Sequence, residues 1–462
     1  MSHTPPYVTV GMPSGLIQRI ADERERLGIP GAAVALFDAR DVVFHGGFGH
    51  ASIGGFPVRA DHTAFRAASI TKLFTATLFL QAIERGRFTL DDPLPRRMNG
   101  QATGIFRGMT ARMLLTHSSR LPTWGGGLSH GVLPQPPCNR VPLRRMLEDI
   151  KPLASPGQRI VYSNAGYALL GQFLAFETGR PFESIAADLL TQLGMGRSEV
   201  ALNPTLSEVA TPYFGGWALQ VCLGLTAAGG LLTTATDLSQ FGRMVLNFGK
   251  FETTRFLRAS TVKKQMLRPL VKNRPSLESG FGLGFQCTRW RDYEIAFHSG
   301  GFVGVSTLLA LLPEPQVGVA VLANVFDREF VYQVAEWAMD AWGRLRPAPP
   351  DGGAAGLSST VTPSELQQFA DVVVGRYNVV DASQPGSLPD PPPIEVFHDG
   401  GGVFRIVVDE LRIPALLYPD GPRGRFRTVH PLGNTGRVLI EIEPGPPAIA
   451  HLWLGTAHAM HV

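Results

Sequence analysis

The sequence predicts an α+β fold, in which an antiparallel sheet with flanking helices adjoins an all-helical lobe and a small all-β domain follows. Three observations support this prediction. Strand-like runs occur near the N-terminus and again between residues 281 and 324, the residues between about 60 and 270 are mostly helical, and a proline-rich break begins at Arg346. Strands at both ends with helices inserted between them predict a sheet that both ends of the first domain complete.

The elements follow in order along the chain. Helical periodicity from Ser14 to Leu27 ends at Gly28, and two apolar runs then predict paired strands, Gly31–Phe37 and Val42–Phe48. The later strands expected in the same sheet are Phe281–Phe285, Ile295–His298, Val303–Leu312 and Val317–Asn324. An amphipathic segment, Glu329–Leu345, predicts the closing helix.

Residues 346–353 contain three prolines and end in two glycines, which is typical of a linker. Beyond them, short apolar runs separated by turn residues predict strands at Val372–Val374, Val403–Val408, Leu411–Leu417, Arg425–Val429, Arg437–Ile442 and Ala448–Leu454. We therefore predict a first domain at residues 1–346, a linker at 347–360 and a small β-barrel at 361–462.

The segment Ser69-Ile70-Thr71-Lys72 is the strongest chemical signal in the chain, because a long apolar helix, Leu73–Ile83, follows it directly. A hydroxyl and an amine three residues apart lie on one face of a helix, roughly 5–6 Å apart at Cβ. The first acidic residue after Lys72 is Glu84, so a buried Lys72 has no nearby carboxylate in sequence. A serine nucleophile needs such a base beside it, and a desolvated lysine can serve.

Two other serines compete with Ser69 as candidate nucleophiles. Ser260 and Lys263 repeat the same spacing, but their segment reads as an exposed amphipathic face. Ser129 lies in a Gly-x-Ser-x-Gly pattern, which in α/β-hydrolases needs a strand before it and a helix after it. A glycine triplet and a proline-rich loop flank Ser129 instead, so an ordinary loop serine is the better interpretation.

Two further motifs follow at long spacing. Tyr162-Ser163-Asn164 precedes the apolar helix 165–173, and His298-Ser299-Gly300-Gly301 precedes the strand-like run at 303–312. Taken singly, each has a structural explanation: Tyr162 as a core tyrosine, Asn164 as a helix N-cap and His298 as a turn residue.

Together, the three motifs resemble those of the penicillin-recognising serine hydrolases. The closest resemblance is to the branch that holds class C β-lactamases, D-Ala-D-Ala carboxypeptidases, D-aminopeptidases and related esterases, in which Ser-x-x-Lys is followed by Tyr-x-Asn. The third element of this branch is Lys-Thr-Gly in the β-lactamases and often His-x-Gly in the esterases and peptidases, and His298-Ser299-Gly300 fits the latter. Similar connecting text extends the resemblance over about residues 14–345, as in 113–119, 155–157, 194–195, 228–231, 235–238 and 281–284. Gly375-Arg376-Tyr377 resembles the opening of the lipocalin-like C-terminal domains attached to some of these hydrolases.

The resemblance implies acyl transfer through a covalent serine ester. Ser69 would be the nucleophile, Lys72 and Tyr162 would share the general-base work, and the N–H groups of Ser69 and Gly301 would form the oxyanion hole. Asn164, His298, Gly300 and Gly301 would contact the substrate or orient the catalytic groups. No metal and no organic cofactor is expected.

The sequence leaves the substrate open. We expect a hydrolase of an ester or of a small amide or D-peptide, and the alternatives are an acyltransferase on the same fold, a β-lactamase or DD-peptidase, and a non-catalytic binding protein. His298 replaces the lysine that β-lactamases use near the substrate carboxylate, which disfavours β-lactam turnover. Arg120 stands where relatives usually have glycine.

Composition agrees with a globular enzyme, and the resemblance implies a small-molecule ester, amide or peptide as its substrate. Of 462 residues, 44% are hydrophobic and 17% charged, and the net charge of +4 comes from arginines spread along the chain, so no nucleic-acid partner is expected. No signal peptide or membrane span is recognised, and the expected location is the cytoplasm. The three cysteines show neither metal-site spacing nor a disulfide framework. We expect the C-terminal domain to shape the cleft entrance or to mediate homo-oligomer formation.

Overall fold

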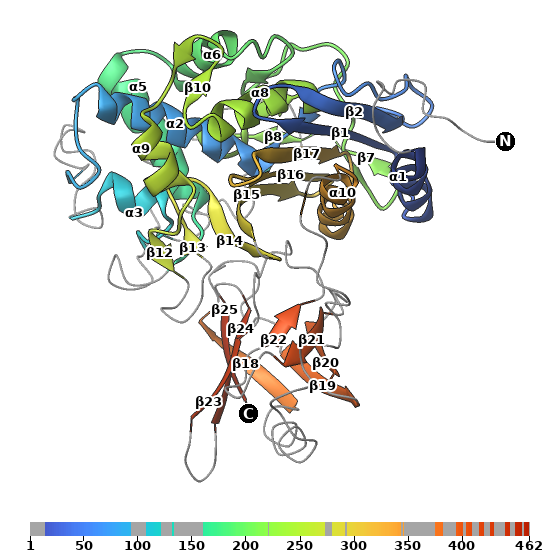
Figure 1. The fold of residues 1–462 in the computed structure, drawn as a ribbon. Helices are drawn as coiled ribbons and strands as arrows, with labels where there is room; N and C mark the ends of the chain where they lie inside the picture. The colour runs from blue at the N-terminus through green and yellow to red at the C-terminus, as the bar shows by residue number, and fades with distance from the viewer. Residues whose placement is uncertain are drawn as a thin grey trace.

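The computed structural model describes residues 14–93, 108–121, 132–133, 160–219, 221–272, 280–291, 293–342 and 345, together with eight strands after residue 374. The predicted fold class is confirmed: an antiparallel sheet is flanked by helices and adjoins a helical lobe (Figure 1). The strand order in the sheet is β12-β13-β14-β15-β16-β17-β1-β2. Its strands are β12 (Val271–Lys272), β13 (Gly280–Phe281), β14 (Gln286–Trp290), β15 (Tyr293–Phe302), β16 (Val305–Leu312), β17 (Val317–Ala323), β1 (Gly31–Asp38) and β2 (Val42–Gly49).

Both ends of this domain complete the sheet, as predicted. β1 pairs antiparallel with β17, from Ala32 opposite Ala323 to Asp38 opposite Val317. Side chains alternate between the two faces of β1, and Val34 and Leu36 pack on one face while Ala33, Ala35 and Phe37 pack on the other. Since both faces are apolar, helices must cover both of them.

The helices that cover the two faces come from distant parts of the chain. α1 (Ser14–Arg26) and α10 (Arg328–Ala341) pack on the face that holds Val34. α8 (Ala235–Leu246) covers the face that holds Phe37 (Figure 1). The close approach of α8 depends on Gly242, because a Cβ atom there would lie 2.3 Å from Cζ of Phe37.

The helical lobe contains a long buried helix, α2 (Thr71–Glu84), and a second one, α5 (Asn164–Thr178), that packs against it. The lobe also contains α3 (Ala111–Leu115), α6 (Phe182–Gln192), α7 (Thr226–Gly229) and α9 (Ala259–Thr261). Short strands form one three-stranded sheet, β3 (Phe65–Arg66), β9 (Leu231–Thr233) and β5 (Glu199–Val200), and three pairs: β6 (Tyr213–Phe214) and β7 (Trp217–Ala218); β10 (Lys250–Phe251) and β11 (Thr254–Arg255); β4 (Val132–Leu133) and β8 (Cys222–Leu223).

After residue 374, the described residues form one antiparallel eight-stranded sheet in the order β22-β21-β20-β19-β18-β25-β24-β23. The strands are β18 (Gly375–Asp381), β19 (Ile394–Gly400), β20 (Val403–Val408), β21 (Ala415–Pro419), β22 (Phe426–Thr428), β23 (Leu439–Glu443), β24 (Ile449–Leu454) and β25 (Ala457–His461). Sequence analysis did not predict β18, β19 and β25, and the strand that it expected at Val372–Val374 lies outside the described residues. The domain boundaries and the closure of this sheet into a barrel stay predictions.

Two expectations about single strands were wrong. The predicted strand 281–285 ends after Phe281, because Gly282 turns the chain by donating to the carbonyl of Phe285 and Gly284 has a φ of +103°. The strand predicted at Ile295–His298 does not end at His298 but continues through the two glycines to Phe302 as β15. The sequence Ser-Gly-Gly has low strand propensity, and the reason for its glycines is the packing of the site described below.

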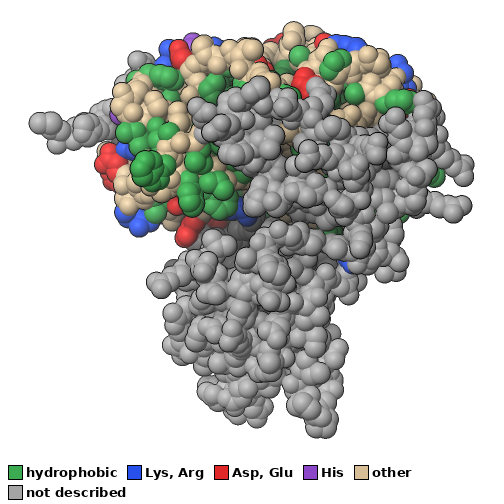
Figure 2. Space-filling model, turned by 180° about the vertical axis from the view of Figure 1, so that it is seen from behind, with side chains coloured by type: hydrophobic (Ala, Val, Ile, Leu, Met, Phe, Trp, Pro, Cys, Tyr) green, Lys and Arg blue, Asp and Glu red, His purple; other side chains and the backbone are tan. Residues whose placement is uncertain are grey.

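No helix among the described residues is both long enough and apolar enough to cross a membrane. On the face seen in Figure 2, basic and acidic side chains of the described residues are interspersed among apolar ones. That mixture suits a surface without a strong field of one sign.

Candidate active site

Ser69 lies in a short 3-10 helix, Ala68–Ile70, that leads into α2. The preceding Ala68 has a φ of +48°, in the left-handed region that a residue with a Cβ atom rarely adopts. Thr71 holds this turn, since its hydroxyl donates to the carbonyl of Ala68 over 2.6 Å and accepts the N–H of Leu231 over 3.0 Å. Strain of this kind is typical of functional sites, where the surrounding structure fixes an unfavourable backbone.

Lys72 is fully buried in the first turn of α2. Its Nζ atom lies 2.9 Å from Oγ of Ser69, 2.6 Å from Oδ1 of Asn164 and 2.8 Å from the carbonyl oxygen of Ala228. None of these three partners carries a negative charge. Burial therefore lowers the pKa of Lys72 well below its ordinary value, which makes a neutral amine accessible beside the hydroxyl of Ser69.

Tyr162 stands two residues before α5, and its ring centroid lies 5.0 Å from Nζ of Lys72. Burial raises the pKa of its phenol, while a hydrogen bond with Ser69 and the charge of Arg328 act in the opposite direction. The phenol is therefore protonated at neutral pH. The N-cap of α5 is Ser163, whose Oγ accepts the N–H of Gly166 over 3.0 Å, so Asn164 is not the cap and its amide oxygen turns to Lys72.

His298 is buried within β15, with its Nδ1 atom 2.7 Å from the carbonyl oxygen of Ser299. Since a carbonyl only accepts, Nδ1 carries the proton, and Nε2 finds no hydrogen-bond partner among the described residues. Burial, and then the charge of Lys72, lower the pKa of His298 to about 3. The imidazole is therefore neutral at neutral pH, and its ring centroid lies 6.2 Å from that of Tyr162.

The two glycines after Ser299 allow β15 to lie against the turn that carries Ser69. A Cβ atom on Gly300 would lie 2.2 Å from both the carbonyl oxygen of Ala67 and Oγ1 of Thr307, and these two atoms are themselves joined by a 2.9 Å hydrogen bond. At Gly301 the nearest atom is Cε2 of the Phe326 ring, at 3.0 Å. The structure thus brings all three motifs together around Lys72 and Ser69.

Sequence analysis missed two residues of this site. His117 stacks on the ring of Tyr162, with centroids 4.3 Å apart and an angle of 28° between the planes. Arg328, the first residue of α10, places its Nε 3.5 Å from the Cβ position of Gly301. His117 belongs to a segment that resembles the family, but no spacing rule links it to Tyr162. No motif marks Arg328 in the sequence. It lies near Gly301 only because of how the strands are ordered in the folded sheet.

Arg120, the other departure from the family pattern, is buried and has a φ of +63°. A glycine adopts this backbone without steric cost, so the glycine that the sequence resemblance led us to expect here would avoid the strain that Arg120 bears.

The competing serines differ from Ser69 in their surroundings. Ser260 is exposed, and Lys263 is also exposed, with its Nζ 4.0 Å above the ring of Phe248. Ser129 lies outside the described residues.

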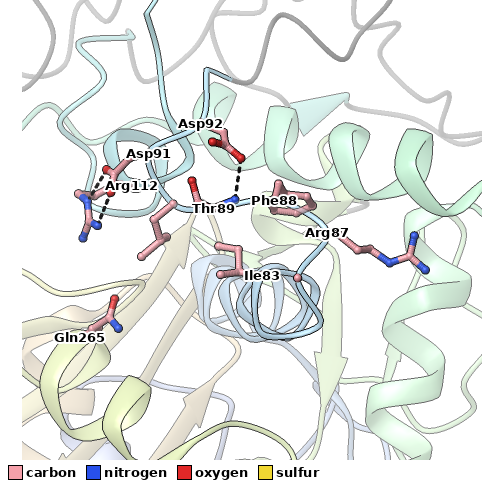
Figure 3. Close-up of a pocket in the computed structure, with 10 residues that line it drawn as sticks. Ile83, Arg87, Phe88, Thr89, Asp91, Asp92, Arg112 and Gln265 are labelled. Carbon is pink, nitrogen blue, oxygen red and sulfur yellow. Dashed lines mark hydrogen bonds and ion pairs between the residues drawn. The ribbon is translucent and has the colours of Figure 1, made fainter.

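An open pocket of about 550 Å³ lies at the other end of α2 (Figure 3). Its lining includes Ile83 and Phe88, and Asp91 there accepts two hydrogen bonds from Arg112, over 2.8 Å and 2.7 Å. A helix rises about 1.5 Å per residue, which puts this pocket roughly 20 Å from Ser69. The pocket therefore takes no part in the chemistry of Ser69.

The family model described as Beta-lactamase matches residues 16–342. This chain belongs to the β-lactamase family. Members of this family are serine hydrolases, and the chain is therefore a serine hydrolase of the β-lactamase family whose substrate the comparisons leave open.

Several known proteins are similar to this chain. A D-alanyl-D-alanine-carboxypeptidase/endopeptidase of Escherichia coli (strain K12), AmpH, is 24% identical over 326 residues, covering 67% of this chain and 84% of that protein. An octameric penicillin-binding protein homologue from Pyrococcus abyssi has a TM-score of 0.64 at 23% identity and covers 96% of this chain and 99% of its own. A D-amino acid amidase from Ochrobactrum anthropi SV3 has a TM-score of 0.60 at 23% identity, covering 71% and 98%. At these identities, the two structures show a shared fold.

Proposed function

We propose that this chain hydrolyses an ester or a small amide or D-peptide bond through an acyl-enzyme on Ser69. The observation that carries the proposal is the environment of Lys72, a buried amine 2.9 Å from Oγ of Ser69 with only uncharged partners. A buried charge without an anion is costly, so a lysine in such a place has a functional reason.

The pKa directions favour a division of work between the two proton-transfer groups. The lowered pKa of Lys72 makes its neutral amine the acceptor of the Ser69 proton when Oγ attacks the carbonyl carbon. The raised pKa of Tyr162 keeps its phenol protonated, so that it donates to the leaving group as the tetrahedral intermediate breaks down. The proton on Lys72 then passes to the phenolate of Tyr162. Water next attacks the acyl-enzyme, and the same two groups transfer the protons as Ser69 is released.

The oxyanion of this intermediate would accept hydrogen bonds from the N–H groups of Ser69 and Gly301. Two donors preorganised in this way stabilise the transition state by about 3 kcal/mol each. The tight packing at Gly300 supports this role, because it fixes β15 against the Ser69 turn and leaves little freedom for the donor on Gly301.

The neutral state of His298 supports a preference for esters over β-lactams. A permanent ammonium would anchor a substrate carboxylate, whereas an imidazole with a pKa of about 3 offers only a dipole at neutral pH. Turnover of p-nitrophenyl esters should therefore exceed turnover of nitrocefin by a wide margin. Equal turnover of the two, or a gain confined to esters in a His298→Lys variant, would contradict this preference.

A screen of the purified protein tests the function. It combines a fluorophosphonate probe with p-nitrophenyl esters, nitrocefin and D-aminoacyl anilides, in the presence and absence of an added acyl acceptor. Mass spectrometry should place the adduct on Ser69, and Ser69→Ala should abolish labelling and turnover while Ser260→Ala leaves both unchanged. An adduct on Ser129 or Ser260 would refute the assignment. Faster product formation with an added acceptor would identify an acyltransferase.

We also propose that the chain self-associates through its C-terminal sheet. The fold likeness to the octameric archaeal homologue extends over 96% of this chain and thus includes that region. Light scattering after size-exclusion chromatography should give a mass above 49.9 kDa, and a monomer at micromolar concentration would contradict the proposal.

A further inference from the structure

His117 stands directly after the end of α3, at a position that usually requires glycine. Its N–H donates to the carbonyl of Leu114 and the N–H of Ser118 donates to that of Met113, which is the hydrogen-bond pattern of a Schellman motif. The residue at this position adopts the left-handed region, and His117 has a φ of +57°. A histidine there costs roughly 1 kcal/mol of stability relative to glycine. This cost indicates that the side chain has a role other than ending the helix.

Two hydrogen bonds and a ring contact join His117 to the segment that carries Tyr162. Its carbonyl oxygen accepts the N–H of Val161 over 2.7 Å, and its Nδ1 accepts the N–H of Ser163 over 3.0 Å. One residue thus holds the peptide groups on both sides of Tyr162, while its ring lies 4.3 Å from the phenol ring.

The tautomer of His117 follows from these bonds. Because Nδ1 accepts a peptide N–H, the neutral ring carries its proton on Nε2. The ring is fully buried, with Phe281 against it edge-on at 4.8 Å and Tyr167 on another side at 5.1 Å. Burial lowers the pKa of His117 well below its ordinary value, so the ring stays neutral and the acceptor on Nδ1 persists at neutral pH.

We propose that His117 is a positioning residue for proton transfer, which fixes the phenol of Tyr162 on Ser69 by clamping the backbone on both sides of it and stacking on its ring. The inference rests on the proposed function, because it needs Ser69 as the nucleophile. His117 itself touches neither the nucleophile nor the substrate in this role. Its effect on the reaction therefore passes through Tyr162.

Two substitutions separate the positioning role from the helix-ending role. His117→Gly relieves the left-handed backbone but removes both the side-chain acceptor and the ring. His117→Asn also tolerates this backbone, and its Oδ1 can accept the N–H of Ser163 as Nδ1 does. As a matched control, Glu252→Gly changes an exposed residue with a φ of +50° in the turn between β10 and β11, which makes none of the contacts described for the site.

The expected results concern kcat for ester hydrolysis. His117→Gly should lower kcat about 100-fold with little change in KM, the size of effect that a displacement near 1 Å produces. The kcat of His117→Asn should be about tenfold higher than that of His117→Gly, and the kcat of Glu252→Gly should match that of the wild type. A wild-type kcat in folded His117→Gly, or equal losses in the Gly and Asn variants, would overturn the proposal.

A double-mutant cycle tests whether His117 acts through Tyr162. In a Tyr162→Phe background, His117→Asn should cause almost no further loss, because the hydroxyl that it positions is already absent. Losses that multiply would show that His117 acts on the site by another route and would overturn the proposal. This failure is distinct from failure of the proposed function, in which the wild type itself would neither label at Ser69 nor hydrolyse esters.

Discussion

The Nζ atom of Lys72 donates to Oδ1 of Asn164 over 2.6 Å, and the two residues are 92 positions apart in the chain. Lys72 lies in the first turn of α2 and Asn164 is the first residue of α5, so the contact joins the beginnings of the two long helices of the helical lobe. The turn before α2 carries Ser69, and the segment before α5 carries Tyr162. The same amine is therefore the common neighbour of the proposed nucleophile and the proposed proton donor.

Lys72→Met should remove the proposed base while keeping an unbranched side chain of similar length. We expect kcat/KM for p-nitrophenyl acetate to fall by about 10²–10⁴-fold, the usual contribution of a general base. Circular dichroism should show a retained fold. Activity close to that of the wild type would exclude Lys72 from proton transfer.

The same variant tests the protonation state of Lys72 through stability. The pKa of Lys72 is lowered in the folded state, so between that pKa and its unfolded value near 10.4 the unfolded chain binds more protons than the folded chain. Lys72 therefore contributes a rise in the free energy of unfolding as pH increases across this window. The Lys72→Met variant lacks this contribution. Urea denaturation of both proteins at pH 7 and pH 9.5 should show the steeper rise in the wild type. Parallel changes would mean that Lys72 stays charged when folded.

Tyr162→Phe deletes only a hydroxyl and should lower turnover by about 10²–10⁴-fold with little change in melting temperature. The matched control is Tyr167→Phe. That hydroxyl is also buried, but it donates to the carbonyl of Leu115 over 2.8 Å. The control should lose about 1 kcal/mol of stability and keep most of its activity. If the two variants have equal activity, the phenol of Tyr162 takes no part in the reaction.

Gly300→Ala and Gly301→Ala should differ sharply in stability. The added Cβ at position 300 meets a backbone carbonyl and Oγ1 of Thr307 at 2.2 Å, so β15 or the Ser69 turn must move. At position 301 the obstacle is the ring of Phe326, which is 41% exposed and can rotate away. We expect Gly300→Ala to lose about 1–3 kcal/mol or more by denaturant titration and Gly301→Ala much less. Equal losses would refute the proposed reason for the glycine at 300.

The sequence supported the fold class, the family and the meeting of Ser69, Lys72, Tyr162 and Asn164, because helix and strand periods and local motifs encode these features. It did not predict that the strand containing His298 continues to Phe302, since Gly300 and Gly301 lower strand propensity while the close approach of Ala67 requires the first of them. His117 escaped notice for a similar reason. Its role depends on a helix end and a segment about 45 residues later, and no periodicity in either one encodes their contact.

The pH dependence of ester hydrolysis should show no ionisation of His298 at neutral pH. Because its pKa is about 3, the imidazole of His298 in the folded enzyme is neutral at pH 5 and at pH 8. The acid limb of kcat/KM should therefore report the loss of the neutral amine of Lys72, with activity rising as pH rises through its lowered pKa. The apparent pKa of that limb should be nearly the same in His298→Asn and in the wild type. Disappearance of the limb in His298→Asn would assign it to the histidine instead.

Removal of the C-terminal region tests whether the site is complete within the first domain. Every residue placed at the site lies between Ser69 and Arg328, and the sheet that holds β15 uses strands from Gly31 to Ala323. A chain that ends at Leu345 should therefore fold and react with a fluorophosphonate at Ser69, with a labelling rate within about tenfold of that of the full chain. Its substrate range or its assembly state is free to change, since these are the roles proposed for the C-terminal sheet. A truncated chain that is soluble and folded, yet unreactive at Ser69, would mean that residues after 345 supply part of the catalytic machinery.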